Sequence, residues 1–289
     1  MTSESADLAV VVVNYNTGDY LARSLRSVQE CAGDARLEIV VVDNASRDES
    51  AAKAVREHPQ AKLISNRSNR GFAAAVNQGI RATGAPFVLL LNPDAEVVSG
   101  TLGGFVKIAR DRPRAGAVGP LVRKPDGEIY PSARKLPSIA EALGHSFLGP
   151  FFPNNRFTRA YTMADWDRQT ERAVDWVSAS CVLLRRAALE EIGLFDERYF
   201  MYVEDVDLCT RLRQAGWEVV FSPELEVLHI GGVSTGGYRS RRMVVEHSRS
   251  IYKYFVKFRS PGWRAAARPF AWLALRLRAE VVLLRRSQH

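Results

Sequence analysis

The sequence has too few cysteines to build a disulfide framework or a zinc site. Only three of its 289 residues are Cys, at positions 31, 181 and 209, and no CxxC pair is present. Three cysteines, an odd number and widely separated, are typical of a protein in a reducing compartment. The first residues lack the basic segment and apolar core of a signal peptide, and no uninterrupted apolar run approaches the ~20 residues of a membrane span. We therefore expect a cytoplasmic protein whose contact with membranes is peripheral.

The common nucleotide-binding loops are also missing. A dinucleotide fold carries G-x-G-x-x-G after its first strand, but this chain reads Asn14-Tyr15-Asn16-Thr17-Gly18 there, and no P-loop motif follows. The Gly-rich basic loop expected of a nucleotidylyltransferase is absent from the same place. These absences argue against an NAD enzyme and a P-loop NTPase, and they leave nucleotidylyl transfer as a weaker alternative.

Charge is unevenly distributed along the chain. Residues 239–289 contain 13 Lys or Arg and two acids, whereas residues 1–238 contain 27 bases and 30 acids. A basic tail on a mildly acidic body favours a local anionic surface over nucleic-acid binding. We therefore divide the chain into a main domain, residues 1–238, and a basic helical C-terminal extension, residues 239–289.

The end of this extension is moderately amphipathic. One helical face carries Phe270, Leu273, Leu277, Val281 and Leu284, and Arg268, Arg278, Arg285 and Arg286 lie away from it. Such a helix is typical of a segment that docks on anionic lipid. It is equally typical of a helix that packs on the body or in a homodimer interface. The sequence leaves both interpretations open.

Strand and helix patterns alternate in the first half of the chain. Buried strands are predicted at Leu8–Val13, Leu37–Val42, Ala61–Ile64 and Pro86–Leu91. Helices are predicted between them at Tyr20–Cys31, Ser50–His58 and Phe72–Thr83. This order predicts an α/β protein with an open, mostly parallel, Rossmann-like sheet flanked by helices, which binds ligands at the carboxyl ends of its strands.

The second half is less regular. Strands are predicted at Ala117–Leu121, Trp176–Leu184, Glu218–Phe221 and Glu226–Ile230. Helices are predicted at Arg186–Ile192 and Glu204–Ala215, and residues 144–172 are expected to form a long loop with short helices. We expect residues 239–289 to be mostly helical.

Polar residues gather where the predicted strands end. The clusters are Asn14-Tyr15-Asn16, Asp43-Asn44-Ala45-Ser46 and Asn92-Pro93-Asp94. Taken singly, each is explained about as well by the preference of Asn, Asp and Ser for turns and helix caps. Together on one rim of a sheet they predict a ligand crevice.

The order of the motifs resembles that of a known family. The motifs are Val11-Val12-Val13-Asn14-Tyr15-Asn16, Val41-Val42-Asp43-Asn44-Ala45-Ser46, Asn69-Arg70-Gly71-Phe72 with Asn77, Asn92-Pro93-Asp94, and Glu204-Asp205-Val206-Asp207-Leu208. From about Leu8 to Thr235 the chain resembles a family 2 glycosyltransferase of GT-A fold, closest to the rhamnosyltransferase-like branch. Each motif is weak alone, but five in this order are specific.

The resemblance implies a catalytic base and a metal site. Asp205 matches the base that removes the acceptor hydroxyl's proton in an inverting transfer. Asp94 matches the acid that holds Mg²⁺ or Mn²⁺ at the donor's diphosphate. Many relatives have a further acid where this chain has Asn92, so another ligand is needed, and His229 is the candidate. The acids of the Glu204 segment have a simpler explanation too, since they complement a helix N-terminus.

The remaining matched residues are expected to line the two substrate pockets. Asp43 can accept a hydrogen bond from the N3–H of thymine or uracil. The residues expected to bind the donor are Asn14, Asn16, Asp43, Asn69, Gly71, Asn77 and Asn92. Those expected at the acceptor or the pocket are Trp176, Ser178, Glu204 and Arg134. Asp207 is expected to be structural.

The resemblance implies transfer of a sugar, L-rhamnose from dTDP-rhamnose, to a lipid-linked or polysaccharide acceptor in cell-envelope glycan synthesis. Only the resemblance to one branch of the family supports the choice of sugar. A UDP-hexose transferase of the same fold stays an alternative, because Asp43 does not distinguish thymine from uracil. A non-catalytic sugar-nucleotide-binding protein is a further alternative, which the presence of Asp94, Asp205 and His229 disfavours.

Overall fold

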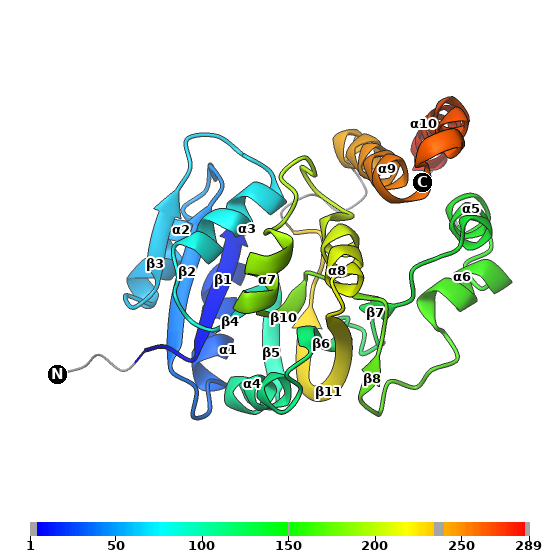
Figure 1. Cartoon of the computed structure of the whole chain (residues 1–289). Helices are drawn as coiled ribbons and strands as arrows, with labels where there is room; N and C mark the ends of the chain where they lie inside the picture. Colours follow the sequence, from blue (N-terminus) through cyan, green and yellow to red (C-terminus); the bar gives the residue numbers. More distant parts are fainter. Residues whose placement is uncertain (1–4, 150, 234–239, 287–289) are drawn as a thin grey trace.

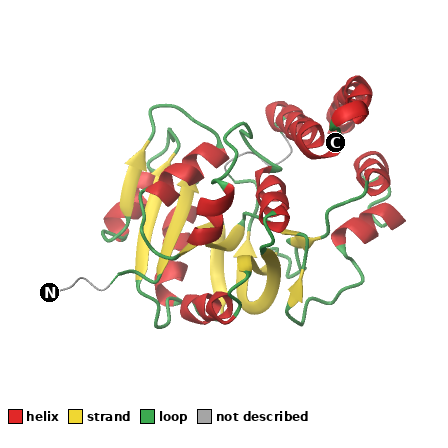
Figure 2. Ribbon diagram, in the orientation of Figure 1, coloured by secondary structure: helices red, strands yellow, loops and turns green. Residues whose placement is uncertain are grey.

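A computed structural model describes residues 5–149, 151–233 and 240–286. In this part of the chain one large sheet runs in the order β3-β2-β1-β4-β10-β6-β11-β5, with β8 paired to β11, and β7 and β9 form a small second sheet. Helices cover both faces of the large sheet, and a separate group of helices lies beyond one end of it (Figure 1, Figure 2). The α/β fold class predicted from the sequence is confirmed.

The N-terminal half is the parallel part of the sheet. Its strands are β1 (Leu8–Asn14), β2 (Leu37–Asp43), β3 (Lys62–Ser65) and β4 (Phe87–Leu91). The connecting helices are α1 (Tyr20–Glu30), α2 (Ser50–Glu57) and α3 (Phe72–Arg81). Every residue of β1 is buried, as expected of a central strand covered on both faces. Asn14 and Asp43 are register partners, so the first two polar clusters lie side by side.

The other half of the sheet is mixed. It contains β5 (Ala95–Ser99), β6 (Ala115–Arg123), β8 (Arg172–Ala173), β10 (Cys181–Arg185) and β11 (Glu218–His229). β10 runs antiparallel to both β4 and β6. The small sheet pairs β7 (Ala133–Arg134) with β9 (Trp176–Val177). The strand predicted at Trp176–Leu184 is therefore two strands, which belong to different sheets.

One further prediction needs correction, and some elements, among them β5 and α4, were not predicted. β11 is one strand rather than two: Pro223 interrupts the sequence pattern, and the strand continues through register shifts after Phe221 and Glu226. β5 was not predicted, because it is short and only partly buried. The helix α4 (Leu102–Asp111) was also missed, because Gly103 and Gly104 lower helix propensity in its first turn.

Further helices follow in the second half of the chain. α7 (Arg186–Ile192) and α8 (Glu204–Gln214) follow the predicted boundaries closely. The segment expected to be a long loop with short helices contains α5 (Ile139–Leu148) and α6 (Arg156–Thr162). Ser138 and Glu141 form a capping box that fixes the start of α5.

The C-terminal extension is helical, as predicted. It contains α9 (Arg241–Tyr254), a π-helical turn (Phe255–Arg259), a 3₁₀ segment (Gly262–Ala267) and α10 (Arg268–Arg286), which packs along α9. The predicted boundary at 238/239 and the side chains of Arg285 and Arg286 lie outside the described residues. Within the described ranges, no helix combines the length and apolarity needed to cross a membrane.

An ion-pair network fastens this extension to the main domain. The Lys257 ammonium lies 2.8 Å from a carboxylate oxygen of Asp196 and 2.6 Å from one of Asp207. Asp207 is fully buried in α8 and also pairs with Arg211 at 2.6 Å. The Tyr254 hydroxyl adds a hydrogen bond to Thr210 at 3.0 Å. These contacts agree with the structural role expected of Asp207.

We expect Asp207→Ala to lower the free energy of unfolding by about 3–5 kcal/mol, because two cations lose their buried partner. Urea unfolding measures this change. Asp165→Ala is the matched control, because Asp165 pairs with Arg159 but its side chain is 80% exposed, and such a pair contributes little. Equal stability of Asp207→Ala and the wild type would contradict the structural role.

Candidate active site

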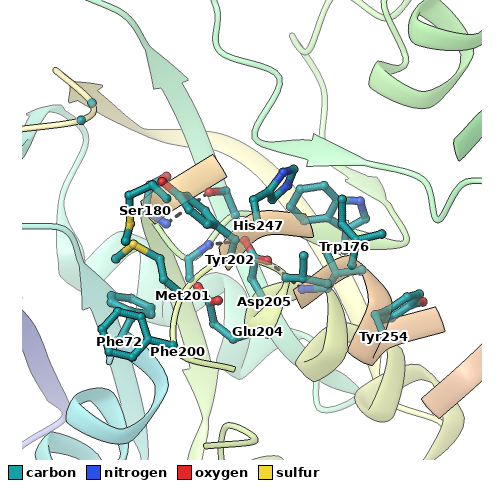
Figure 3. A pocket seen from close by; sticks show the side chains of 18 of the residues that line it. Phe72, Trp176, Ser180, Phe200, Met201, Tyr202, Glu204, Asp205, His247 and Tyr254 are labelled. Carbon is teal, nitrogen blue, oxygen red and sulfur yellow. Dashed lines mark hydrogen bonds between the residues drawn. The ribbon is translucent and has the colours of Figure 1, made fainter. Parts of the chain in front are cut away.

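The carboxyl ends of the strands open into a cavity of about 860 Å³. One end is lined by residues from the ends of β1, β2 and β4, the middle by β9 and the start of α8, and the far end by α5, α9 and α10. Figure 3 shows a close view of this cavity with Trp176, Glu204, Asp205 and His247 among its walls. The predicted site residues that line it are Asn69, Gly71, Asn92, Asp94, Arg134, Trp176, Ser178, Glu204, Asp205 and His229.

The Asp43 carboxylate is held in place from β1. The Asn14 side chain donates a hydrogen bond to Asp43 Oδ1 at 2.8 Å, and the backbone N–H of Ser46 donates to Oδ2 at 3.2 Å. Asn14 is fully buried and also contacts Ser50, at 2.8 Å. These bonds fix the orientation of the Asp43 carboxylate. Neither Asn14 nor Asp43 is among the residues that line the cavity.

An asparagine that the sequence analysis did not single out joins the next two loops. The Asn44 amide donates to Asn69 Oδ1 at 3.0 Å and to the Gly71 carbonyl at 3.2 Å. Gly71 has φ +85°, and a Cβ there would lie 2.7 Å from the Phe200 carbonyl oxygen. Glycine is therefore required at this position, both for the backbone conformation and for the close approach of the Phe200 loop.

Two further predicted donor residues, Asn77 and Asn16, also lie outside the lining of the cavity. The Asn77 side chain donates to the Phe195 carbonyl and to Glu197, both at 2.9 Å, and it accepts from the Phe195 N–H at 3.0 Å. Asn16 adopts φ +52°, and its side chain accepts from the Arg47 N–H at 2.7 Å. These contacts favour structural roles over the donor-binding roles predicted from the sequence.

Asp94 and His229 meet at the edge of the cavity. His229 Nε2 lies 3.2 Å from Asp94 Oδ1 and 3.2 Å from the Asn92 amide nitrogen. The pairing of β11 with β5 sets this arrangement, because His229 is the register partner of Ala95. The Ile230 N–H also donates to the Asp94 carbonyl at 3.0 Å. Two residues 135 positions apart are thus fixed by backbone bonds.

The electrostatics of Asp94 suit a cation ligand. Burial favours the neutral acid, but the hydrogen bond and charge of His229 outweigh it and hold the pKa of Asp94 below its ordinary value. In the described part of the chain no three His, Cys, Asp or Glu residues are grouped as a metal site. The chain would thus supply two ligands, Asp94 and His229, which fits a metal that also takes phosphate oxygens and water.

Asp205 stands at the N-terminal end of α8, where the helix dipole favours a carboxylate. It accepts hydrogen bonds from the Val206 N–H at 2.8 Å and the Ala179 N–H at 3.3 Å. Tyr202 and Val203, the two residues just before the start of α8, both have φ +68°. Two consecutive left-handed non-glycine residues are strained, and such strain is common where a loop must present a functional group.

Glu204 and Asp205 differ in their tendency to ionise. Burial, and then the charge of Asp205, raises the pKa of Glu204 well above its ordinary value. Burial also raises the pKa of Asp205, but the Ala179 and Val206 N–H groups and the charge of Arg134 oppose this shift. Glu204 Oε2 is buried without a hydrogen-bond partner in the described structure. Burial thus favours the neutral form of Glu204 more than that of Asp205, whose carboxylate is stabilised by these N–H groups and by Arg134, a division typical of acid–base sites.

The sequence profile of "Glycosyl transferase family 2" matches residues 9–193. This chain belongs to family 2 of the glycosyltransferases. The enzyme is 39% identical to the N-acetylglucosaminyl-diphospho-decaprenol L-rhamnosyltransferase of Mycobacterium tuberculosis, over 97% of this chain and 95% of the relative. It is 24% identical to rhamnosyltransferase WbbL of Escherichia coli K12, over 86% of this chain and 93% of that protein.

Solved structures support the fold of this family 2 glycosyltransferase. GalNAc-T7 with UDP, GalNAc and Mn²⁺ superposes with a TM-score of 0.64 at 17% identity, over 93% of this chain and 51% of that one. The mannosyltransferase PcManGT of Pyrobaculum calidifontis with GDP-Man and Mn²⁺ gives 0.58 at 17% identity, over 99% and 81%. The GT-A fold expected from the resemblance is confirmed.

The glycosyltransferase's central wall is aromatic and basic. The Arg134 guanidinium lies over the rings of Trp176 and Tyr161, 5.0 and 5.2 Å from their centroids. Ser178 accepts a hydrogen bond from the Ser180 N–H at 3.3 Å. Arg134 and Trp176 were predicted from the sequence, but Tyr161 was not. No local signal marks Tyr161, because it reaches the wall from α6 in the irregular segment.

Proposed function

We propose that this glycosyltransferase transfers L-rhamnose from dTDP-rhamnose, with inversion, to a lipid-linked GlcNAc acceptor in cell-envelope glycan synthesis. One observation carries the proposal: a single cavity joins Asp205 to the Asp94–His229 pair. The near full-length identity to the mycobacterial rhamnosyltransferase supports the choice of sugar and of acceptor.

In the proposed reaction Asp205 is the general base. Its carboxylate takes the proton of the acceptor hydroxyl as that oxygen bonds to the anomeric carbon, and the bond from this carbon to the leaving phosphate oxygen breaks. The nucleoside diphosphate leaves from the opposite face, so the configuration inverts. Neutral Glu204 can donate a hydrogen bond to the acceptor sugar without competing for the proton.

The donor is expected to lie along the ends of β1, β2 and β4. Asp43 is proposed to accept a hydrogen bond from the thymine N3–H, and Asn69, Gly71 and Asn92 to border the donor. A divalent cation, Mg²⁺ or Mn²⁺, held by Asp94 and His229 would neutralise the negative charge of the leaving diphosphate. Asn92 lies beside both ligands and is proposed to hold the His229 ring in place.

The enzyme is proposed to work on the cytoplasmic face of the membrane, as a peripheral protein. Phe270, Leu277 and Leu284 of α10 are 76%, 56% and 66% exposed. They lie on a basic extension, which complements anionic lipid headgroups. The other interpretation, in which a second copy of the chain covers this face, predicts a dimer at micromolar concentration in lipid-free buffer.

A panel of nucleotide-sugars tests the donor. We expect hydrolysis and transfer with dTDP-rhamnose to exceed those with UDP-glucose, UDP-galactose or UDP-GlcNAc by about tenfold or more, because a pocket that hydrogen-bonds the correct sugar leaves polar groups unpaired with others. GDP-mannose is the purine control and should bind worst. Preference for a UDP-hexose would replace rhamnose with the alternative donor, and retention at the anomeric carbon would overturn the role of Asp205.

A further inference from the structure

Charge is segregated along the cavity. Among the described lining residues, the acidic side chains are Asp94, Glu204 and Asp205, which come from the rim of the sheet and the start of α8. Towards the C-terminal extension the charged side chains that line the cavity are Arg134, Arg259 and Arg278. Two other lining cations lie apart from these arginines: Lys124 is paired with Glu128, and Arg242 lies over the Phe200 ring, which packs on Gly71. The part of the cavity lined by the three arginines therefore suits an anion that is distinct from a donor held beside Asp94.

Arg134 and Arg278 face the same small group of side chains. Both guanidinium charges act on His145 of α5 and on His247 of α9. Burial, followed by these charges, lowers the pKa of His145 to about 4 and that of His247 to about 3. Both imidazoles are therefore neutral at pH 7 and can hydrogen-bond without adding charge. Arg134 also acts on Asp205, so the cluster borders the reaction centre.

Beyond this cluster the cavity becomes apolar. Its walls there include Leu143 and Phe147 of α5 and Ala271, Ala274 and Leu275 of α10. The apolar surface continues outside, where Leu143 is 51% exposed and Leu277 is 56% exposed. α5 and α10 lie at the same end of the molecule, remote from β3 (Figure 1). An apolar chain can thus pass from the cavity to the surface between these two helices.

The three surfaces occur in a fixed order: carboxylates, then arginines, then an apolar exit. A glycosyl diphospho-lipid has the matching order of sugar, diphosphate and hydrocarbon. We propose that Arg134 and Arg278 bind the diphosphate of the acceptor and that its lipid chain leaves between α5 and α10. Guanidinium groups suit this role because each can give two parallel hydrogen bonds to phosphate oxygens. The inference rests on the proposed function, whose acceptor it specifies.

Two water-soluble acceptors that differ only in the diphosphate test the site, in buffer without phospholipid. They are citronellyl diphospho-α-GlcNAc and citronellyl α-GlcNAc. We expect Arg278→Gln to raise KM for the first by about 10–100-fold, the effect of losing a charged hydrogen bond, and to leave KM for the second unchanged. Arg276→Gln is the matched control: Arg276 is exposed on the same helix and lies over Trp272, outside the cavity. It should change neither value.

A binding measurement separates this inference from the proposed function. Citronellyl diphosphate carries no sugar, so calorimetry with it does not depend on which donor or acceptor sugar the enzyme uses. We expect wild type and Arg276→Gln to bind it equally and Arg278→Gln to bind at least tenfold more weakly, with thermal unfolding confirming that all three are folded. Failure of rhamnosyl transfer with this binding pattern intact would overturn the proposed function alone.

Three results would overturn the inference. The first is equal binding of citronellyl diphosphate by wild type and Arg278→Gln. The second is an equal rise of KM for both acceptors, which would place Arg278 at the sugar. The third is an unchanged KM for both with weaker binding to phosphatidylglycerol vesicles, which would assign the arginine to lipid headgroups of the membrane.

Phe147→Ser tests the apolar exit between α5 and α10, and should lower the preference for a polyprenyl over a citronellyl acceptor.

Discussion

Asp205→Asn is expected to lower the rate of sugar transfer by about 10²–10⁴-fold, the usual contribution of a general base. The amide keeps the size of the carboxylate and can still accept from the Val206 N–H, 2.8 Å away in the wild type, but it cannot take a proton. Binding of the nucleotide-sugar should be unchanged, because the base acts on the acceptor. Single-turnover transfer and calorimetric donor binding measure the two quantities.

Glu204→Gln is the companion variant. Because burial and the neighbouring charge raise the pKa of Glu204 and favour its neutral form, its amide analogue should lose far less activity than Asp205→Asn. The pH profile adds a further check. The base works only when deprotonated and its pKa is raised, so activity should rise with pH through a midpoint above the ordinary Asp value of about 4. Near-normal transfer by Asp205→Asn would show that another group is the base.

Metal dependence is expected to respond in opposite directions to two substitutions at one site. His229→Ala removes one of the two proposed protein ligands. It should raise the Mn²⁺ concentration for half-maximal activity by at least the roughly 10–100-fold that loss of an outer-shell partner costs. Asn92→Asp supplies a carboxylate 3.2 Å or so from the same imidazole, and should lower that concentration. Activity titrated with Mn²⁺ after chelation measures both.

The paired design guards against misfolding as the cause. Damage to the protein does not explain tighter metal binding. The result for Asn92→Asp is therefore the more informative of the two. If both variants give the wild-type titration, the divalent ion is not held by Asp94 and His229. In the absence of metal, the wild type, His229→Ala and Asn92→Asp should unfold at similar temperatures.

The parallel half of the sheet was predictable because its information is local. β1, β2 and β4 consist mainly of apolar residues, and the polar residues at their ends share one rim by the geometry of parallel strands. The boundaries of α8 were also readable, from the acids of its first turn and from Gly216 just beyond its end. These features need no knowledge of which distant segments meet.

Other parts of the site depend on contacts between distant segments. Asn44 resembles any turn residue until its hydrogen bonds to Asn69 and Gly71 are seen. Asn77 matched a motif, yet its amide binds the loop at Phe195. Arg134 of β7 and Arg278 of α10 line the same cavity, although the two elements are more than 130 residues apart in sequence. Periodicity and residue type do not show which distant segments meet. The sequence therefore did not decide the role of the C-terminal extension.

The bulge in the β5–β11 pairing limits how this enzyme can change length during evolution. Glu226 pairs with Ser99 and Val227 with Val97, so Val98 of β5 is the extra residue, and His229 then pairs with Ala95, next to Asp94. Alternate residues of a strand point to opposite faces. A single inserted or deleted codon between Val227 and His229 would thus turn the imidazole away while leaving every ligand in the sequence. Surface loops tolerate such changes readily, so length variation among relatives should avoid this short stretch.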